Sequence, residues 1–336
     1  MTAQLAQENN ANKHIPVLLD EVVTALSPVS GEVYVDGTFG AGGYTRAVLG
    51  AADCGVVAID RDPHAVGRAG AFVQEFGERF RICEGCFGDM DTLLSKAGTP
   101  TVNGIMLDIG VSSFQLDEAE RGFSFREDGP LDMRMSAEGE SAADVVNTYD
   151  EGALADIIYQ YGEERKSRRI ASAIVKRRDA EVFSRTLDLA NLIEAVLGRA
   201  PVQKGRRSVH PATRTFQALR IHVNDELGEL RRGLRAAEAA LAEGGRLVVV
   251  SFHSLEDRIV KSFMAERSGR VPSASRHMPA TVGTGPSASF SMQSAKVVKP
   301  SRDEEQRNPR ARSARLRVAI RTSAQAWHDA EEAAHA

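Results

Sequence analysis

Cysteine is scarce in this sequence of 336 residues, which holds only Cys54, Cys83 and Cys86. Three cysteines cannot build the disulfide framework of a small secreted protein, so we expect a reducing, cytoplasmic environment. No apolar run approaches the roughly 18 residues of a membrane-spanning helix, and we expect no membrane contact. Residues 1–12 lack the basic-then-apolar pattern of a signal peptide and are expected to form a polar tail. The 42% hydrophobic and 26% charged residues are typical of a soluble globular protein. The length of 336 residues suggests two domains, or one large domain with an insertion.

A large excess of one charge sign is also missing. The net charge is −4, which taken alone argues against a nucleic-acid binder. The charges are segregated, however: residues 161–220 hold 14 Lys and Arg against 6 Asp and Glu, a net +8. Residues 296–317 hold 8 against 3, a net +5, and residues 117–144 hold 3 against 9, a net −6. Local fields of this kind steer a polyanion, although each run can also be only a solvated helix face.

Six short runs have the pattern of β-strands, and the first four alternate with turn or helix signals. Such alternation indicates βαβ units and a parallel sheet, so we predict an α/β fold with a doubly wound, Rossmann-like sheet. The six runs are residues 32–36, 55–60, 80–83, 104–108, 246–250 and 316–320.

The stretch between the fourth and fifth runs is too long for one crossover and has a helical pattern. Thr148 and Glu151 have the spacing of a capping box, and an apolar stripe over 189–197 is stopped by Gly198. Pro211 is expected to open one long helix that reaches Leu234. The predicted organisation is a discontinuous domain at 13–116 and 217–322, a helical insertion at 117–216, a second tail at 323–336 and a mobile loop at 268–300.

A glycine-rich turn follows the first strand and reads Asp-Gly-Thr-Phe-Gly-Ala-Gly-Gly-Tyr-Thr over residues 36–45. It lacks Gly-Lys-Ser/Thr, which excludes a P-loop nucleotide hydrolase. Asp36 comes before the glycines, including Gly40, and suits a ligand that carries an ammonium and a sulfonium. Asp60 ends the second strand 24 positions later, where a carboxylate can bind both hydroxyls of a ribose. Together these features favour S-adenosyl-L-methionine over NAD.

Three further side chains follow strands three and four. Phe87 can stack on an adenine, or it can pack under the edge of the sheet. Asp108 ends the fourth strand beside the glycine-rich turn and can hold the ammonium of the ligand. Gln115 can add hydrogen bonds to that ligand, or it can be a surface loop side chain. Cys83 and Cys86 form an isolated Cys-x-x-Cys, which is too few ligands for a zinc site, and we expect no metal.

The motifs together resemble the family of bacterial ribosomal RNA small subunit methyltransferase H. They are Asp-Gly-Thr-Phe-Gly at 36–40, Ile-Asp-Arg-Asp-Pro at 59–63, Leu-Asp-Ile-Gly-Val-Ser-Ser at 107–113, Arg-Gly-Phe-Ser-Phe at 121–125, Asp-Gly-Pro-Leu-Asp-Met-Arg-Met at 128–135, His-Pro-Ala-Thr-Arg-Thr-Phe-Gln-Ala-Leu-Arg-Ile at 210–221, Ser-Phe-His-Ser-Leu-Glu-Asp-Arg at 251–258 and Asn-Pro-Arg-Ala-Arg-Ser at 308–313. The resemblance spans roughly residues 14–321. It implies a class I methyltransferase sheet and an enzyme that methylates the exocyclic N4 of a cytidine in the decoding region of 16S rRNA.

The resemblance also implies which residues bind S-adenosyl-L-methionine. They are Gly42, Gly43, Tyr44, Asp60, Phe87, Asp108 and Gln115. The family's turn usually reads Gly-Arg-Gly-Gly-His, whereas here Ala41 and Tyr44 replace the Arg and the His. The backbone of Tyr44 can still serve the cofactor, but an imidazole is absent at that position.

Methylation of a cytosine amino group needs an acceptor for an N4 hydrogen, because the nitrogen lone pair is delocalised into the ring. The Asp-Pro-Pro-aromatic run that many amino-group methyltransferases carry after strand four is replaced here by Asp-Ile-Gly-Val at 108–111. The catalytic candidates are therefore Asp132, which alternatively pairs with Arg134, and His253, which alternatively caps a helix that begins near Ser254.

The basic runs predict contacts with the phosphates of 16S rRNA or of the small ribosomal subunit. The candidate side chains are Arg168, Arg169, Arg177, Arg178, Arg206, Arg207 and Arg214. Three other function classes compete with this interpretation: an NAD(P) oxidoreductase, a methyltransferase of small molecules or proteins, and an RNA-binding factor without activity. Asp36 argues against the first, the long basic insertion against the second, and the retained Asp60 and Asp108 against the third.

Overall fold

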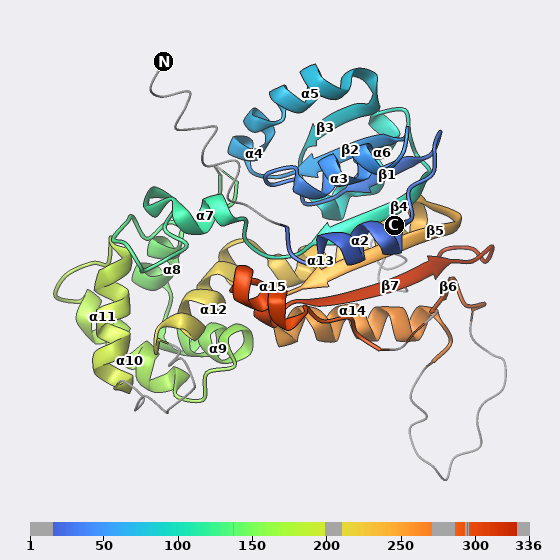
Figure 1. Ribbon diagram of the computed structural model, residues 1–336. Helices are drawn as coiled ribbons and strands as arrows, with labels where there is room; N and C mark the ends of the chain where they lie inside the picture. Colours follow the sequence, from blue (N-terminus) through green and yellow to red (C-terminus); the bar gives the residue numbers. More distant parts are fainter. Residues whose placement is uncertain are drawn as a thin grey trace, which may run out of the picture. The chain divides into compact units, whose positions relative to one another are not determined.

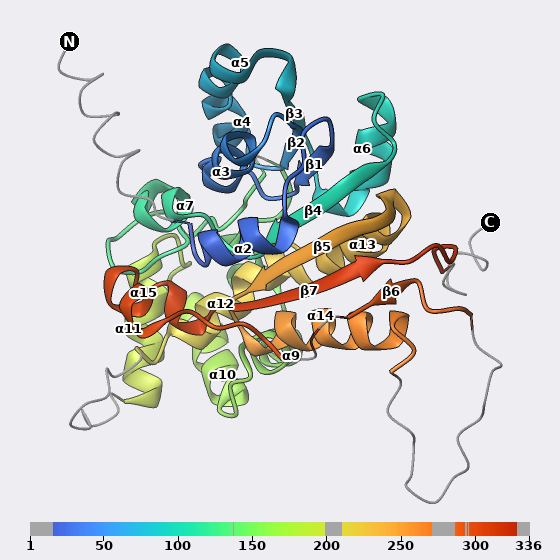
Figure 2. The same cartoon turned by 45° about the vertical axis from the view of Figure 1, so that its right-hand side comes forward.

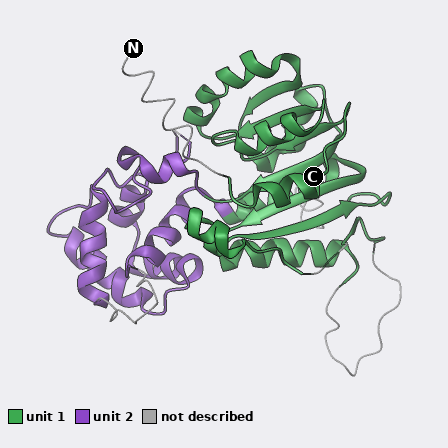
Figure 3. Ribbon diagram, viewed as in Figure 1, with its two compact units in different colours: residues 1–110, 227–336 green, residues 111–226 purple. Residues whose placement is uncertain are grey.

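The computed structural model describes residues 16–136, 138–198, 210–270, 286–292, 294 and 296–327. The chain divides into two compact units (Figure 3). Unit 1 comprises residues 1–110 and 227–336, and unit 2 comprises residues 111–226. Unit 2 is thus inserted into the sequence of unit 1. The predicted bounds of the insertion, 117–216, are narrower than this unit at both ends.

Unit 1 contains a seven-stranded sheet in the order β3-β2-β1-β4-β5-β7-β6 (Figure 1). Strands β1 to β5 are parallel, β7 runs antiparallel to β5, and β6 runs antiparallel to β7. All six predicted strands are present, whereas β6, with two residues, is too short to carry a sequence pattern. The strands are β1 (Val33–Asp36), β2 (Gly55–Asp60), β3 (Phe80–Glu84), β4 (Val102–Asp108), β5 (Leu241–Ser251), β6 (Phe290–Ser291) and β7 (Arg315–Arg321).

Helices cover both faces of this sheet, as Figures 1 and 2 show. Successive side chains of a strand point to opposite faces, so a strand buried on both sides reads as a continuous apolar run. Tyr34 of β1 and Met106 of β4 belong to the cluster that contains Val22, whereas Val35 and Ile105 belong to the opposite cluster. The helices of unit 1 are α2 (Leu19–Leu26), α3 (Gly43–Ala51), α4 (Pro63–Arg68), α5 (Gly70–Phe76), α6 (Met90–Lys96), α13 (Glu226–Ala240, whose first residue falls in unit 2), α14 (Ser254–Arg267) and α15 (Arg302–Arg307).

Unit 2 is helical and has its own core. The side chains of Leu154 and Ile158 on α9 and of Ile170 on α10 are fully buried in this core. The described helices of unit 2 are α7 (Ser113–Asp117), α8 (Ala142–Thr148), α9 (Glu151–Gly162), α10 (Ser167–Arg178), α11 (Thr186–Leu197) and α12 (Thr213–Val223).

Two local predictions for the insertion are wrong. Thr148 ends α8, and the N-cap of α9 is Asp150, whose carboxylate accepts from the backbone N–H of Ala153 at 2.9 Å. The single long helix expected from Pro211 to Leu234 is two helices, α12 and α13. The chain turns between them at Asp225, which has a φ of +46°, so the apolar period continues across a break in the backbone.

The predicted loop and tails fall largely outside the described residues. This holds for residues 271–285 of the expected loop 268–300, for the tail 1–12 and for residues 328–336 of the second tail. Among the helices that are described, none is long and apolar enough to cross a membrane.

Candidate active site

Three carboxylates end three adjacent strands of unit 1. Asp36 is the last residue of β1, Asp60 of β2 and Asp108 of β4. These strands are parallel neighbours in the order β2-β1-β4, so their carboxyl ends meet at one edge of the sheet. From β1 the chain continues outward to β2 and β3 and then returns to β4 on the other side of β1, and open α/β sheets bind ligands where the strand order reverses in this way.

Asp36 is fully buried and stabilises the glycine-rich turn. Its Oδ2 accepts a hydrogen bond from the hydroxyl of Thr45 at 2.7 Å, and its Oδ1 accepts from the backbone N–H of Thr38 at 3.2 Å. Burial raises the pKa of Asp36 to about 6, against the lowering effect of these hydrogen bonds. Both carboxylate oxygens thus have partners inside the turn, and Asp36 contributes mainly its charge to the site.

Asp60 joins the turn to the start of α4. Its Oδ2 accepts from the backbone N–H of Gly40 at 2.7 Å, and its Oδ1 accepts from the backbone N–H of Asp62 at 2.9 Å. Burial raises the pKa of the Asp60 carboxyl, and these two N–H donors oppose that shift. Each oxygen keeps a second lone pair that can accept a hydroxyl hydrogen, which is what a ribose requires.

The glycines of the turn are required by backbone geometry at Gly42. Its φ is +74°, and a Cβ atom there would lie 2.3 Å from Cζ of Phe72. Gly43 starts α3, and a Cβ atom on it would lie 2.3 Å from Cγ of Pro16. Only glycine fits either position, and the N-terminus of α3 follows directly with its free N–H groups.

Tyr44, which stands where the family usually has a His, is a buried residue of α3. Its hydroxyl donates to the carbonyl of Val17 at 2.5 Å and so ties the chain before α2 to α3. Burial raises the pKa of Tyr44 well above its usual range, and the neighbouring charges of Asp108 and Asp36 add to this shift. Tyr44 is therefore a neutral neighbour of Asp108, not an imidazole-like acid or base.

Asp108 is the carboxylate with unused capacity. Its backbone N–H donates to the hydroxyl of Thr38 at 2.7 Å, whereas its buried Oδ1 accepts no hydrogen bond from the described residues. Burial, together with the charges of Asp36 and Glu256, raises the pKa of Asp108 to about 8, against a lowering effect of the neighbouring Tyr44 hydroxyl. A buried carboxylate oxygen without a donor is a place for a cationic group of a ligand.

Phe87 lies in the turn after β3 and packs against α13. A Cβ atom on Gly233 of α13 would lie 2.3 Å from Cδ2 of Phe87, so the ring uses the space that this glycine leaves. The next residue, Gly88, donates its backbone N–H to Oε1 of the buried Glu229 at 2.7 Å. The ring is partly buried against the core, which agrees with the packing alternative and leaves part of it accessible for an adenine.

Gln115 belongs to unit 2, and the alternative of a surface loop side chain is wrong. The residue is 5% exposed and completes a capping box at the start of α7. Its Oε1 accepts from the backbone N–H of Ser112 at 3.0 Å, and its own N–H donates to the hydroxyl of Ser112 at 3.2 Å. A role toward the cofactor stays a prediction.

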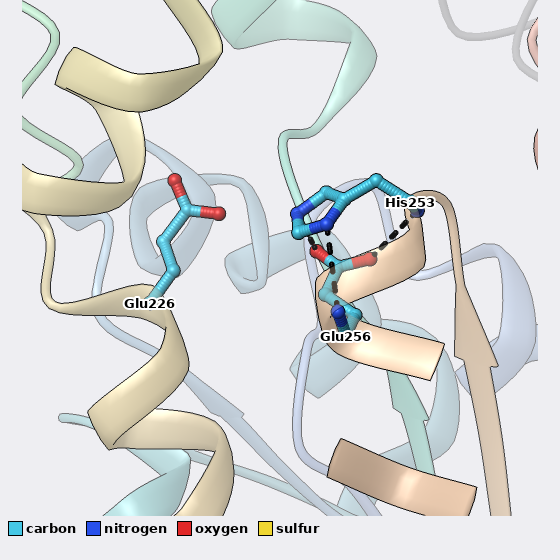
Figure 4. A group of neighbouring side chains, drawn as sticks. All are labelled: Glu226, His253 and Glu256. Atoms are coloured by element: carbon cyan, nitrogen blue, oxygen red, sulfur yellow. Dashed lines mark hydrogen bonds and ion pairs between the residues drawn. The ribbon is translucent and has the colours of Figure 1, made fainter. Parts of the chain in front are cut away.

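His253 caps α14, as its structural alternative predicts (Figure 4). Its Nδ1 accepts from the backbone N–H of Glu256 at 3.4 Å, and its Nε2 lies 2.9 Å from Oε1 of the same residue. Glu256 is fully buried, and its Oε2 accepts from the backbone N–H of Phe252 at 2.8 Å. The imidazole thus serves as the cap of α14, and its role in catalysis stays a prediction.

Asp132, in unit 2, forms the alternative ion pair with Arg134. Nε and Nη2 of Arg134 donate to the two carboxylate oxygens at 2.9 and 2.7 Å. Burial alone would raise the pKa of Asp132, but the hydrogen bonds from Arg134 outweigh it and the pKa is lowered. A low pKa makes this carboxylate a weak base, so its catalytic role stays a prediction that this geometry does not favour.

The basic candidates of unit 2 fall into two groups. Arg168 and Arg169 on α10 and Arg214 on α12 are exposed. Arg178 donates to the carbonyls of Val146 and Tyr149 at 2.8 and 2.6 Å, and the guanidinium of Arg177 lies 4.5 Å from the ring centre of Phe183. Arg177 and Arg178 therefore hold α10 in unit 2. Arg206 and Arg207 lie outside the described residues.

Sequence reasoning missed Thr38, Thr45 and Glu256, which complete the surroundings of Asp36 and Asp108. Only Glu256 has a local signal, since it stands three residues after His253 with the spacing of a capping box. Thr38 and Thr45 belong to the motif itself, but their partners depend on how the turn folds back over β1. The thiols of Cys83 and Cys86 have pKa values raised by burial, which keeps them protonated and unreactive.

The fold and this edge define a class of protein. The mixed sheet has seven strands, a glycine-rich turn after β1, and carboxylates that end β2 and β4. These are the features of an α/β methyltransferase that uses S-adenosylmethionine. Residues 11–322 match the MraW methylase family, and the chain belongs to this family.

Named relatives agree with this assignment. The chain is 59% identical over 316 residues to the ribosomal RNA small subunit methyltransferase H of Hyphomonas neptunium, with 94% of this chain and 91% of that protein covered. It is 59% identical over 314 residues to the protein of the same name in Paramagnetospirillum magneticum, with 94% of this chain and 97% of that protein covered. The Rhodospirillum rubrum protein of that name is 57% identical over 322 residues, with 95% and 97% covered.

Proposed function

We propose that this methyltransferase transfers the methyl group of S-adenosylmethionine to the exocyclic N4 of a cytidine in the decoding region of 16S rRNA. The observation that carries the proposal is that Asp36, Asp60 and Asp108 meet at one edge of the sheet. The chain is also 59% identical to a named relative over 94% of its own length. An rRNA substrate makes the cytoplasm its place of action.

The residues at this edge fit S-adenosylmethionine. The open acceptor at Oδ1 of Asp108 matches the ammonium of the cofactor, and the remaining lone pairs of Asp60 match its ribose hydroxyls. The exposed part of Phe87 suits the adenine, and Gly42, Gly43 and Tyr44 let the backbone approach the methionine portion. The cofactor supplies an activated methyl group on a positively charged sulfur.

The chain's own contribution to the reaction is mainly positioning, because methyl transfer is an in-line displacement. The acceptor of the N4 hydrogen is proposed to be one of the two sequence candidates, His253 and Asp132. Each already has a partner in the chain: Nδ1 of His253 accepts from the backbone N–H of Glu256, and both oxygens of Asp132 are bound by Arg134.

The test is methyl transfer from labelled S-adenosylmethionine to small ribosomal subunits, to naked 16S rRNA and to free cytidine in parallel. We expect label in 16S rRNA as N4-methylcytidine from at least one of the first two substrates, and none in free cytidine. Label that appears only in protein or in a small molecule contradicts the proposal. A change in nicotinamide absorbance with a hydroxy-acid substrate would favour an oxidoreductase.

Replacing Asp60 by Ala is expected to weaken S-adenosylmethionine binding by roughly tenfold to a hundredfold, since losing one charged hydrogen-bond partner costs about 1.5–3 kcal/mol. Calorimetric titration measures this affinity. Asp53→Ala is the matched control, because Asp53 precedes the same strand at its opposite end and its side chain is 85% exposed. Equal affinities of a folded Asp60→Ala variant and the wild type would remove Asp60 from the site.

A further inference from the structure

Unit 2 has a surface hollow that the methyl-transfer site does not explain. It has a volume of about 310 Å³ and lies where the end of α9 meets the start of α10. Its lining combines Tyr159 and Asp156 of α9 with a group of cationic side chains. These are Arg165, Lys166, Arg168 and Arg169. The volume is at the lower end of the range of about 300–1,000 Å³ that small ligands occupy, so it suits one nucleotide.

The side chains that line the hollow are mostly cationic, so the hollow favours an anionic ligand. Four cations face a single carboxylate, that of Asp156. The side chains of Arg165, Lys166 and Arg168 make no hydrogen bond or ion pair with any part of the chain that is described. They differ in this from Arg178, whose guanidinium is bound to two carbonyls. Cations that have no partner among the described residues are available for the phosphates of a ligand.

Tyr159 adds an aromatic face to these cations. The residue is 59% exposed, and it is the one aromatic among the exposed large hydrophobic residues of the described ranges. The other exposed side chains of this kind are aliphatic, such as Val182 at 62%. A solvated tyrosine beside a row of cations is the combination with which proteins bind single-stranded nucleic acid, because each base can stack on the ring while the phosphates are neutralised.

We propose that this hollow binds one unpaired nucleotide of the RNA substrate, with its base stacked on Tyr159 and its flanking phosphates on Arg165, Lys166 and Arg168. The inference rests on the proposed function, since it concerns the same RNA. The inference goes beyond the proposed function because it places a single-strand binding site in the insertion, outside the edge formed by Asp36, Asp60 and Asp108. A duplex keeps its bases stacked inside and offers the hollow phosphates only, so single-stranded RNA is the expected ligand.

The experiment uses the full-length protein and a fluorescein-labelled, unstructured RNA of eight nucleotides, with binding followed by anisotropy. Tyr159→Ala is expected to weaken binding roughly tenfold, within the range known for loss of one base–aromatic stack. Tyr159→Phe keeps the ring and is expected to bind within about twofold of the wild type, on the same stacking argument. Val182→Ala is the matched control for removal of an exposed hydrophobic side chain from unit 2, and no change is expected.

Three outcomes overturn the proposal. The first is equal binding of the eight-nucleotide RNA by the wild type and Tyr159→Ala, and the second is equal binding by the wild type of this RNA and of its duplex. An acidic peptide of the same charge that displaces the RNA with equal strength would also identify the hollow as a general anion surface and contradict it. Methyl transfer by the wild type to small subunits is measured in parallel. If transfer occurs and Tyr159 has no effect, only the hollow assignment fails; if no transfer occurs, the proposed function fails.

Discussion

Replacing Asp108 by Asn is expected to abolish most of the pH dependence of S-adenosylmethionine binding. In the ligand-free protein the pKa of Asp108 is raised to about 8, first by burial and then by Asp36 and Glu256. Below that pH the carboxyl is neutral and must lose its proton before it can pair with the ammonium of the cofactor. Wild-type affinity should therefore rise about tenfold from pH 6 to pH 7, and the rise should end near pH 8, where the α-amino group of the cofactor, with a pKa of about 7.7–8.0, begins to lose its own proton.

Calorimetric titration between pH 5.5 and pH 9 measures this profile, and repeating it in buffers of different ionisation enthalpy counts the released protons. The Asn variant should show weak binding that does not rise between pH 6 and pH 7, below the range in which the cofactor's own α-amino group titrates, and no proton release in that range. The pKa of Asp36 is raised only to about 6, so its titration affects the lower end of the range. Parallel profiles for the wild type and the variant would exclude Asp108 as the ammonium partner.

The raised pKa of Asp108 also makes the stability of the ligand-free protein depend on pH. A carboxyl whose pKa is raised by folding binds more protons in the folded state than in the unfolded state between about pH 4 and pH 8. The free energy of unfolding of the ligand-free wild type should therefore fall as pH rises through this window. Asn cannot ionise, so the Asp108→Asn variant should have the higher melting temperature at pH 8 and above.

The rate of methyl transfer at saturating cofactor distinguishes two roles of Asp108, namely binding of the cofactor's ammonium and acceptance of the N4 hydrogen bond. If it holds the ammonium, single-turnover methylation of 16S rRNA by the Asn variant should recover at saturating cofactor. If it instead accepts the N4 hydrogen bond, the saturating rate should drop by about 10²–10⁴-fold. We expect the first outcome, because the open oxygen of Asp108 lies at the edge with the glycine-rich turn. A saturating rate that stays a hundredfold low would reverse this assignment.

The sheet and the grouping of Asp36, Asp60 and Asp108 could be predicted from the sequence. Strands of a buried parallel sheet read as unbroken apolar runs, and the carboxyl ends of such strands meet at one edge, so a residue's place at the end of a run is enough. The two-residue strand β6 was out of reach, because its pairing with β7 depends on the tertiary fold.

The break between α12 and α13 could not be predicted, because the apolar period runs through it. Asn224 defines the turn: its Oδ1 accepts from the backbone N–H of Met135 at 2.8 Å, and its amide donates to the carbonyl of Met133 at 2.8 Å. These partners are about 90 residues away in the sequence. The burial of Gln115 and the helix-holding role of Arg178 escaped prediction for the same reason, since a polar side chain's partners depend on the fold.

Reversing the charge of Arg165, Lys166 and Arg168 to Glu is expected to weaken binding of 16S rRNA by roughly 10²–10³-fold at 0.1 M salt, since each lost phosphate contact costs about five- to eightfold there. The slope of log affinity against log salt should become shallower by about two to three. Arg177 and Arg178 are left unchanged, because they pack on Phe183 or bind carbonyls and their reversal would disturb α10. Cofactor affinity should not change, because none of the three is among the residues assigned to the cofactor.

The control is a triple reversal with the same change in net charge in the other basic run. Lys296, Lys299 and Arg302 are exposed residues of unit 1 and serve this purpose. Non-specific attraction depends on total charge, so it would flatten the salt slope equally in both triple variants. A specific interface in unit 2 predicts a large effect in the first variant and a small one in the second. Equal slopes in the two variants would mean that the basic face of the insertion is only a solvated surface, and the rRNA would then have to be held elsewhere on the chain.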